Sequence, residues 1–246
     1  MDPLQSIDAL GNITKHELNI SDIIMGAWKI FTDHLQAIVL ITITVFLPLN
    51  IITVLLPGQD ATAETLDPSS ALGLGISAGL LALVGVLVPM AIAYIVRQHL
   101  DRQPVDFNSA IRFSFSRWLP VVGTSLLMMA FLFGLTFLLV LPAIIFAVYW
   151  AFTTYVVSLK GKSGLDALRY SQALVRGRWW KVIGYLFVFG FITGMIGWLI
   201  GLPFVNIHNH IVNALISTLS DIIFSFTIVA TALFFINMDS VRRTPA

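Results

Sequence analysis

The chain contains no cysteine, and only 11% of its 246 residues are charged. The absence of cysteine excludes disulfide bonds, thiolate metal sites and cysteine nucleophiles. So little charge excludes an ordinary soluble domain, which is typically about one quarter charged. Hydrophobic residues make up 57% of the chain, which indicates an integral membrane protein.

Chemical signatures are also sparse. The sequence has no His-Glu-x-x-His pair and no phosphate-binding P-loop, and its net charge is only +1. We therefore expect a protein that is not an enzyme, with no cofactor, no metal and no nucleic-acid partner.

Apolar runs long enough to cross a hydrocarbon core of roughly 30 Å as helices occur six times along the chain. They must be helices because a lipid-exposed backbone has to satisfy its own hydrogen bonds, and because the runs lack the alternation of barrel strands. The sequence predicts an all-α polytopic membrane helix bundle in one domain, residues 21–238, between a polar tail at 1–20 and a cytoplasmic tail at 239–246. The predicted spans lie near residues 36–56, 71–96, 119–140, 142–158, 180–202 and 212–238.

The basic residues follow a strict pattern. When the loops are assigned alternately to the two sides of the membrane, all 14 Lys and Arg residues fall on one side, and the outer loops carry none. Cytoplasmic loops collect Lys and Arg, so this pattern predicts that both termini are cytoplasmic.

An amphipathic segment precedes each odd-numbered span, and each span pair contains a tryptophan, an apolar run and an outer-side Leu-Pro. We interpret this as three transmembrane hairpins, each preceded by an interfacial helix on the cytoplasmic side. The predicted apolar stripes comprise Ile24, Ala27, Trp28, Phe31 and Leu35 in the first segment; Phe107, Ala110, Ile111, Phe115 and Trp118 in the second; and Leu165, Leu168 and Val175 in the third, which a Ser163-x-x-Asp166 capping box opens.

Three stretches resemble a known pattern: AWKIFTDHLQAIVLITITVFLP, AYIVRQHLDRQPVDFNSAIRFSFSRWLP and GLDALRYSQALVRGRWWKVIGY. They are similar to the YciC-like family of multi-span bacterial membrane proteins and to the membrane domain of some glycerophosphodiester phosphodiesterases. The resemblance covers roughly residues 20–240. It implies a bacterial inner-membrane protein of six spans with no assigned biochemical role, and no phosphodiesterase chemistry is carried over.

Asp221 is the exceptional residue within the spans. Charged residues inside a membrane are costly and mark candidate functional sites. A polar stripe at helical spacing surrounds it, and two histidines on the outer approach are the nearest groups that could share a proton with it. Two readings stay open, a cavity-lining role and a position at the membrane interface. The stripe comprises Asn213, Ser217, Thr218, Asp221 and Ser225, and the histidines are His208 and His210.

Two further groups of residues have structural or lipid-binding interpretations. Cations and tryptophans at the start of the fifth span are typical of a contact with anionic lipid headgroups, or of a specific phosphate site. Glycines at helical spacing permit close helix packing or provide a hinge. The first group is Arg176, Arg178, Trp179, Trp180 and Lys181, and the second is Gly75, Gly79, Gly190, Gly194, Gly197 and Gly201.

The leading functional hypothesis is a non-enzymatic protein that binds or transports a small or lipid-like molecule, with a cavity at the Asp221 stripe open to the outside. The alternative is a structural protein whose glycine faces bind a partner or a second copy of the chain. An intramembrane enzyme acting on lipids is a third hypothesis. Membrane lipids are the expected partners in each case.

Overall fold

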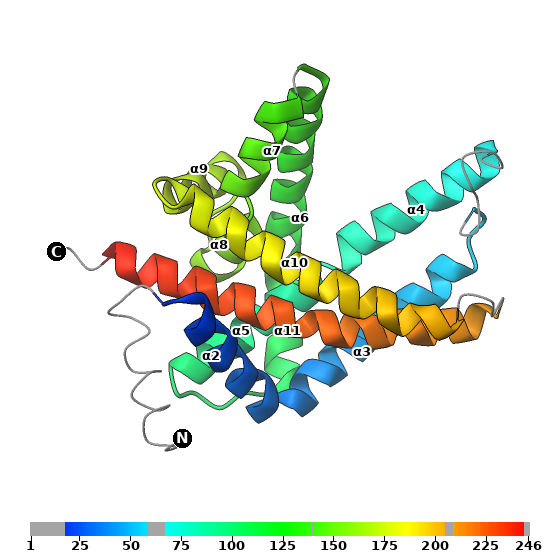
Figure 1. Cartoon of the computed structure of the whole chain (residues 1–246), viewed down its shortest axis with the longest axis horizontal. Helices are drawn as coiled ribbons and strands as arrows, with labels where there is room; N and C mark the ends of the chain where they lie inside the picture. The colour runs from blue at the N-terminus through cyan, green and yellow to red at the C-terminus, as the bar shows by residue number, and fades with distance from the viewer. Residues whose placement is uncertain (1–17, 59–66, 139, 205–208, 244–246) are drawn as a thin grey trace.

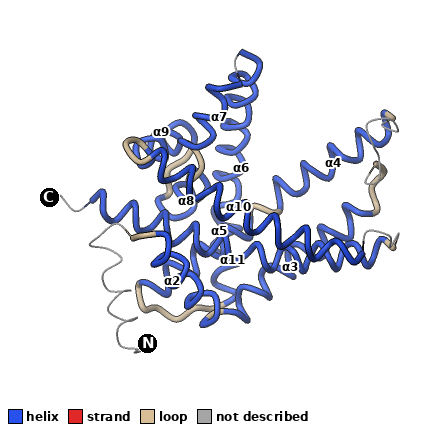
Figure 2. Tube along the Cα trace, in the orientation of Figure 1, coloured by secondary structure: helices blue, strands red, loops and turns tan. Residues whose placement is uncertain are grey.

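The computed structural model describes residues 18–58, 67–138, 140–204 and 209–243. Every secondary-structure element in these ranges is helical (Figure 2), which confirms the all-α prediction. The elements are α2 (Ile20–Asp33), α3 (Leu35–Val54), α4 (Pro68–Val84), α5 (Leu87–Leu100), α6 (Phe107–Leu138), α7 (Val140–Tyr149), α8 (Thr153–Lys160), α9 (Gly164–Val175), α10 (Trp179–Gly201), the short 3-10 helix η1 (Leu202–Phe204) and α11 (His210–Arg243).

Six helical segments are long and apolar enough to cross a membrane, as predicted. Two of them are interrupted near their middle. The second span divides into α4 and α5 at Gly85–Val86, and the fourth divides into α7 and α8 at residues 150–152. The sequence predicts both spans as continuous helices, because the length and hydropathy of an apolar run carry no information on a local break. The spans run over Leu35–Val54, Pro68–Leu100, Phe107–Thr136, Val140–Lys160, Trp179–Phe204 and Ile211–Arg242.

The last helix, α11, occupies the centre of the bundle. It packs against α2, α3, α5 and α10 (Figure 1), and the residues of its second half, from Ile228 to Met238, are mostly buried. It continues as helix to Arg243, beyond the predicted boundary at residue 238. By contrast, α10 and α6 lie at the periphery, since only 11% of the most apolar stretch of residues in each of these spans is buried. Their exposed apolar side chains fit contact with lipid.

The predicted interfacial helices differ in outcome. The segment 107–118 is not a separate helix but the first part of α6, because no glycine separates it from the span and Pro120 removes only one hydrogen bond of the helix. Two other segments are separate helices, α2 and α9. Ser163 is the N-cap of α9, as expected, but its side chain makes no capping hydrogen bond.

Within α2 the buried face overlaps the predicted stripe only in part, at Ala27 and Phe31. Ile23, Ala27 and Ile30 are fully buried against the bundle, whereas Ile24 and Trp28 are exposed. Apolar residues also flank the predicted stripe on the helix surface, so the sequence alone does not show which of the neighbouring apolar faces is buried. Trp28 contacts only an edge of the core, with its ring 6.0 Å from that of Phe226. That α2 lies in the membrane interface stays a prediction.

Consecutive spans contact one another in the pairs α3–α4, α6–α7 and α10–α11. In Figure 1, α2, α9 and the end of α11 lie on the left, whereas the end of α3, the start of α4 and the end of α10 lie on the right. The basic residues near Lys160, Arg176 and the end of α11 are therefore at one end of the bundle. The orientation of this end toward the cytoplasm, like the three-repeat organisation, stays a prediction.

Candidate functional site

The polar stripe on α11 partly faces α3, where it meets polar side chains. Asn50 of α3 donates from Nδ2 to the Asp221 carboxylate at 2.8 Å and to the Thr218 hydroxyl at 3.1 Å. Further along the same contact, the hydroxyls of Thr42 and Ser225 share a hydrogen bond of 2.8 Å. The carboxylate of Asp221 thus has an interhelical donor in place of a fixed cation.

Not all members of the predicted stripe take part in this contact. Thr218 and Ser225 are buried and Asp221 is half-buried, but Ser217 is exposed and Asn213 is only half-buried. The position of Ser217 contradicts a single continuous polar face, because four-residue spacing drifts around a helix of 3.6 residues per turn. His208 lies outside the described residues, and nothing is described of the His210 side chain.

The partners of the stripe on α3 were missed in the sequence. Asn50 is the one amide in residues 37–56, and Thr42 lies two helical turns before it. A polar residue inside an apolar run is a usable signal, because interhelical hydrogen bonds in membranes involve such residues. The run had been taken as a uniform span.

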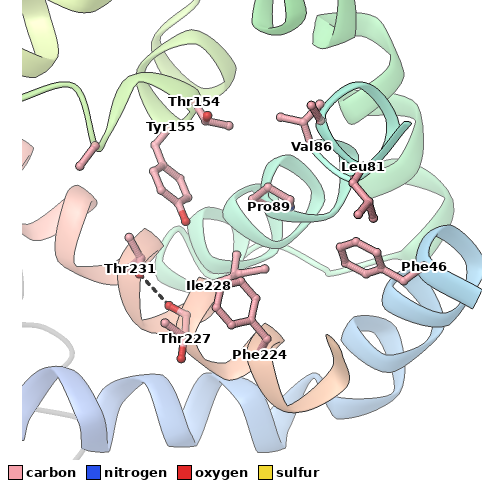
Figure 3. Close-up of a pocket in the computed structure, with 13 residues that line it drawn as sticks. Phe46, Leu81, Val86, Pro89, Thr154, Tyr155, Phe224, Thr227, Ile228 and Thr231 are labelled. Atoms are coloured by element: carbon pink, nitrogen blue, oxygen red, sulfur yellow. Dashed lines mark hydrogen bonds between the residues drawn. The ribbon is translucent and has the colours of Figure 1, made fainter. Parts of the chain in front are cut away.

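A cavity of about 430 Å³ lies near the middle of the bundle, between α3, α4, α5, α8 and α11 (Figure 3). Its residues fall near the centres of the second and sixth spans, so it lies well inside the membrane. Both helix breaks line it: Gly85 and Val86 belong to the α4–α5 break, and Ala151 to the α7–α8 break. The lining residues are Phe46, Leu81, Ala82, Gly85, Val86, Pro89, Ala151, Thr154, Tyr155, Phe224, Thr227, Ile228 and Thr231.

Side chains from other helices hydrogen-bond to backbone carbonyls at the breaks. Trp118 Nε1 donates to the carbonyl of Leu83 at 2.6 Å, and the Ser171 hydroxyl donates to the carbonyl of Tyr149 at 2.8 Å. A broken helix is tolerated in a membrane only where its backbone groups find such partners within the protein. Both breaks are therefore built into the packing of the bundle.

The cavity and the Asp221 contact are neighbours but are not one site. Phe46 lies one turn before Asn50 on α3, and Phe224 lies one turn after Asp221 on α11, and these two aromatic side chains line the cavity. Asp221 itself does not line it. Its carboxylate accepts a hydrogen bond from Asn50. That the Asp221 stripe lines a cavity open to the outside stays a prediction.

The rim of the cavity includes apolar side chains that are open to the surroundings. Leu81 is 41% exposed and Phe224 is 47% exposed. On a membrane-spanning bundle, exposed apolar groups near the middle of a span face the hydrocarbon. The part of the rim that these two side chains form is therefore apolar.

Comparison with known protein families gives a match over most of the chain. The family described as Domain of unknown function (DUF7847) matches residues 71–238. The chain belongs to this family. The DUF7847 match contains every lining residue of the cavity except Phe46, but it does not contain Asn50. No curated protein and no solved structure matches the chain. The resemblance to YciC-like proteins stays a prediction.

The glycines that were expected to pack helices closely do not do so within the DUF7847 chain. At Gly75, Gly79, Gly190, Gly194, Gly197 and Gly201, a Cβ atom would meet nothing within 4 Å. The close approach occurs instead at Gly73, where a Cβ would lie 2.0 Å from the carbonyl oxygen of Pro57. Spacing alone does not distinguish a glycine in a close contact from one that faces open space. A GxxxG pattern places glycines on one face of a helix but does not determine which element, if any, packs there.

The cluster at the start of α10 is at the surface, as a lipid contact requires. Trp180 is 81% exposed, and its ring lies 4.8 Å from that of Trp179 in an edge-to-face arrangement. Arg176 is exposed, Arg178 is the N-cap of α10, and Lys181 is half-buried. Binding of anionic headgroups here stays a prediction.

The sequence Gly75-Ile-Ser-Ala-Gly79 has the Gly-x-Ser-x-Gly spacing of a hydrolase nucleophile. The structure places it inside α4, where the Ser77 hydroxyl is buried and donates to the carbonyl of Gly73 at 2.9 Å. A nucleophile elbow requires a sharp turn between a strand and a helix. This pentapeptide therefore lacks the geometry of a nucleophile.

Two further polar contacts were not predicted from the sequence. The Asp239 carboxylate accepts hydrogen bonds from the Lys160 ammonium and the Tyr170 hydroxyl. His34, at the joint between α2 and α3, shares a hydrogen bond of 2.9 Å with His99 of α5. Burial lowers the pKa of His34 below its ordinary value. These pairs join segments far apart in the chain, which no local pattern reveals.

Proposed function

We propose that the protein binds a small apolar or lipid-like molecule in the cavity at the two helix breaks, without converting it chemically. The supporting observation is that two separate spans are interrupted at positions that line the same cavity. Interrupted helices that meet near the bilayer midplane are typical of substrate sites in membrane transporters. A volume of about 430 Å³ is within the range of small-molecule sites.

The rim and the wall of the cavity favour a membrane-soluble ligand. The rim carries exposed apolar side chains, and most of the wall is aliphatic or aromatic. A ligand already dissolved in the bilayer enters such a site without losing hydration, so the site selects by shape and by its few polar groups. Transport across the membrane is a further step of the same proposal and requires the cavity to open at one end.

A photo-crosslinking experiment tests the proposal. The probe is a long-chain alcohol that carries a diazirine in its chain, added to the purified full-length protein in detergent. We expect cross-links to map to α8 and α11, and we expect Ala151→Phe, which fills the cavity, to abolish them. Ala78→Phe is the matched control, because Ala78 is exposed on α4 and does not line the cavity. Equal labelling of both variants would contradict binding in the cavity.

A second candidate function is a membrane interaction protein, and the open glycine face of α10 favours it. Gly190, Gly194 and Gly197 leave space that no atom of the described chain fills. We expect Gly194→Leu to disrupt any self-assembly while the cavity variants leave it unchanged. Cross-linking in native membranes followed by mass determination distinguishes this candidate from ligand binding.

The proposed location is the bacterial inner membrane, with both termini in the cytoplasm. The one-sided distribution of the 14 basic residues supports this orientation. Because the chain has no cysteine, single substitutions can be labelled without background. We expect Ser69→Cys, at the start of α4, to react with an impermeant maleimide from outside intact cells, and Ser163→Cys to react only after permeabilisation. The reverse result would invert the topology.

A further inference from the structure

The wall of the cavity has two chemically different sides. One side is apolar and is formed by α3 and by residues at the α4–α5 break (Figure 3): Phe46, Leu81, Val86 and Pro89. Hydroxyl-bearing residues of α8 and α11 form the other side. These residues, which we term the hydroxyl side, are Thr154, Tyr155, Thr227 and Thr231.

The hydroxyl side is polar but uncharged, and each of its hydroxyl groups can both donate and accept a hydrogen bond. Thr231 donates its proton to the backbone carbonyl of Thr227 at 2.7 Å, so its oxygen can act toward other groups only as an acceptor. The Tyr155 hydroxyl points toward Thr231 in Figure 3. The Tyr185 hydroxyl, also close to Thr231, is fully buried and makes no hydrogen bond of good geometry with any described residue.

An unpaired buried hydroxyl is costly, and natural structures seldom keep one. The Thr231 oxygen has two lone pairs and lies close to both tyrosine hydroxyls, so Tyr155 can donate either to Thr231 or to a ligand oxygen in the cavity. The hydroxyl side therefore suits a ligand that ends in an uncharged oxygen.

The wall also lacks charge. None of the 13 lining residues is acidic, basic or a histidine. Asp221, one turn before Phe224 on α11, does not line the cavity and accepts a hydrogen bond from Asn50. A carboxylate or phosphate placed in the cavity would lose its hydration without gaining a counter-charge, whereas a neutral oxygen would only exchange one hydrogen bond for another.

We infer that the ligand of this cavity is a neutral amphiphile: an apolar chain or ring system that ends in an uncharged oxygen, either a hydroxyl or a carbonyl. Its oxygen accepts a hydrogen bond from Tyr155, and its apolar part packs against Phe46, Leu81 and Phe224. Fatty acids and phospholipid headgroups are excluded as ligands on this reasoning. The inference rests on the proposed function, since it assumes that the cavity is a binding site.

Two photo-probes with the same diazirine-bearing chain test the inference, one ending in an alcohol and the other in a carboxylate. Both are added to the full-length protein in detergent at a pH that keeps the carboxylate ionised. We expect the alcohol to label the cavity on the order of tenfold more strongly than the carboxylate, because only the carboxylate must shed charge hydration. Equal or stronger labelling by the carboxylate overturns the inference and leaves the proposed function standing.

Substitutions then locate the hydrogen bond. Tyr155→Phe keeps the ring and removes the donor, so we expect it to decrease labelling by the alcohol several-fold. Tyr149→Phe is the matched control, because Tyr149 does not line the cavity, and it should leave labelling unchanged. If Tyr155→Phe does not fold, Thr231→Val is the second variant: it removes the acceptor within the protein that competes for the Tyr155 proton, so we expect labelling by the alcohol to increase. Unchanged labelling of a folded variant overturns the role of the hydroxyl side, and no labelling by either probe refutes the proposed function as well.

Discussion

Replacement of Asp239 by asparagine tests the buried ion pair at the basic end of the bundle. Asp239 is only 5% exposed, and its carboxylate holds the Lys160 ammonium and the Tyr170 hydroxyl. Asparagine preserves the shape of the side chain but removes the negative charge that pairs with the Lys160 ammonium. The Lys160 side chain is only 16% exposed. Removal of one member of a buried pair costs about 3–5 kcal/mol.

We expect a loss of about 3 kcal/mol, the lower end of that range, because the flexible lysine side chain can extend its charge toward water. For a protein of this size, 1 kcal/mol corresponds to roughly 2–4 °C in the thermal midpoint, so the expected decrease is about 6–12 °C. The assay is thermal unfolding of the detergent-solubilised protein at one fixed heating rate, because unfolding of such proteins is often irreversible.

Asp101→Asn is the matched control for this variant. Asp101 pairs with Arg97 at 3.5 Å, but the two side chains are 58% and 49% exposed. An exposed pair contributes less than about 1 kcal/mol, so the midpoint should hardly change. If Asp239→Asn shifts the midpoint no more than Asp101→Asn does, the Lys160 pair is hydrated and the reasoning from burial is wrong.

Two further predictions concern pH and glycine. Burial lowers the pKa of His34 below 6.5, so between that lower value and 6.5 the unfolded chain binds protons that the folded chain does not. Stability therefore falls as the pH falls through this window. The thermal midpoint should decrease between about pH 7.5 and 5.5, and His34→Gln should make this decrease smaller. If the decrease is the same in the variant, His34 is not its cause. On α4, we expect Gly73→Ala to lower the midpoint, because its Cβ would meet the Pro57 carbonyl at 2.0 Å. Gly75→Ala should raise the midpoint by the helix propensity of alanine, up to about 1 kcal/mol, since its Cβ meets nothing within 4 Å; a shift of the same sign in both variants would contradict the geometry.

The agreement between sequence and structure is greatest where a single physical requirement acts along the chain. Crossing a hydrocarbon layer demands a long apolar helix, and the segments Leu35–Val54 and Trp179–Phe204 were predicted to within a few residues. The break at Gly85–Val86 was not predicted. Its stability depends on Trp118, a residue of another helix that donates to the Leu83 carbonyl.

The candidate site follows the same division. Asp221 was identified from the sequence because a carboxylate in an apolar run is costly wherever it points. Its partner Asn50 lies 171 residues away, so the direction of the carboxylate and its absence from the cavity wall depend on how α3 packs on α11. The cavity itself is made by five helices, and none of its residue types is unusual within its own span.

The sequence by itself determined that this protein is all-helical, with six segments long and apolar enough to cross a membrane. These properties are set by the transfer of each segment between water and lipid, which depends on composition alone. Only the tertiary structure decided where the second and fourth spans break, which polar groups pair, and where a cavity remains. Those features arise from the packing of side chains that are distant in the chain, and burial against a specific neighbour leaves no periodic trace in the sequence.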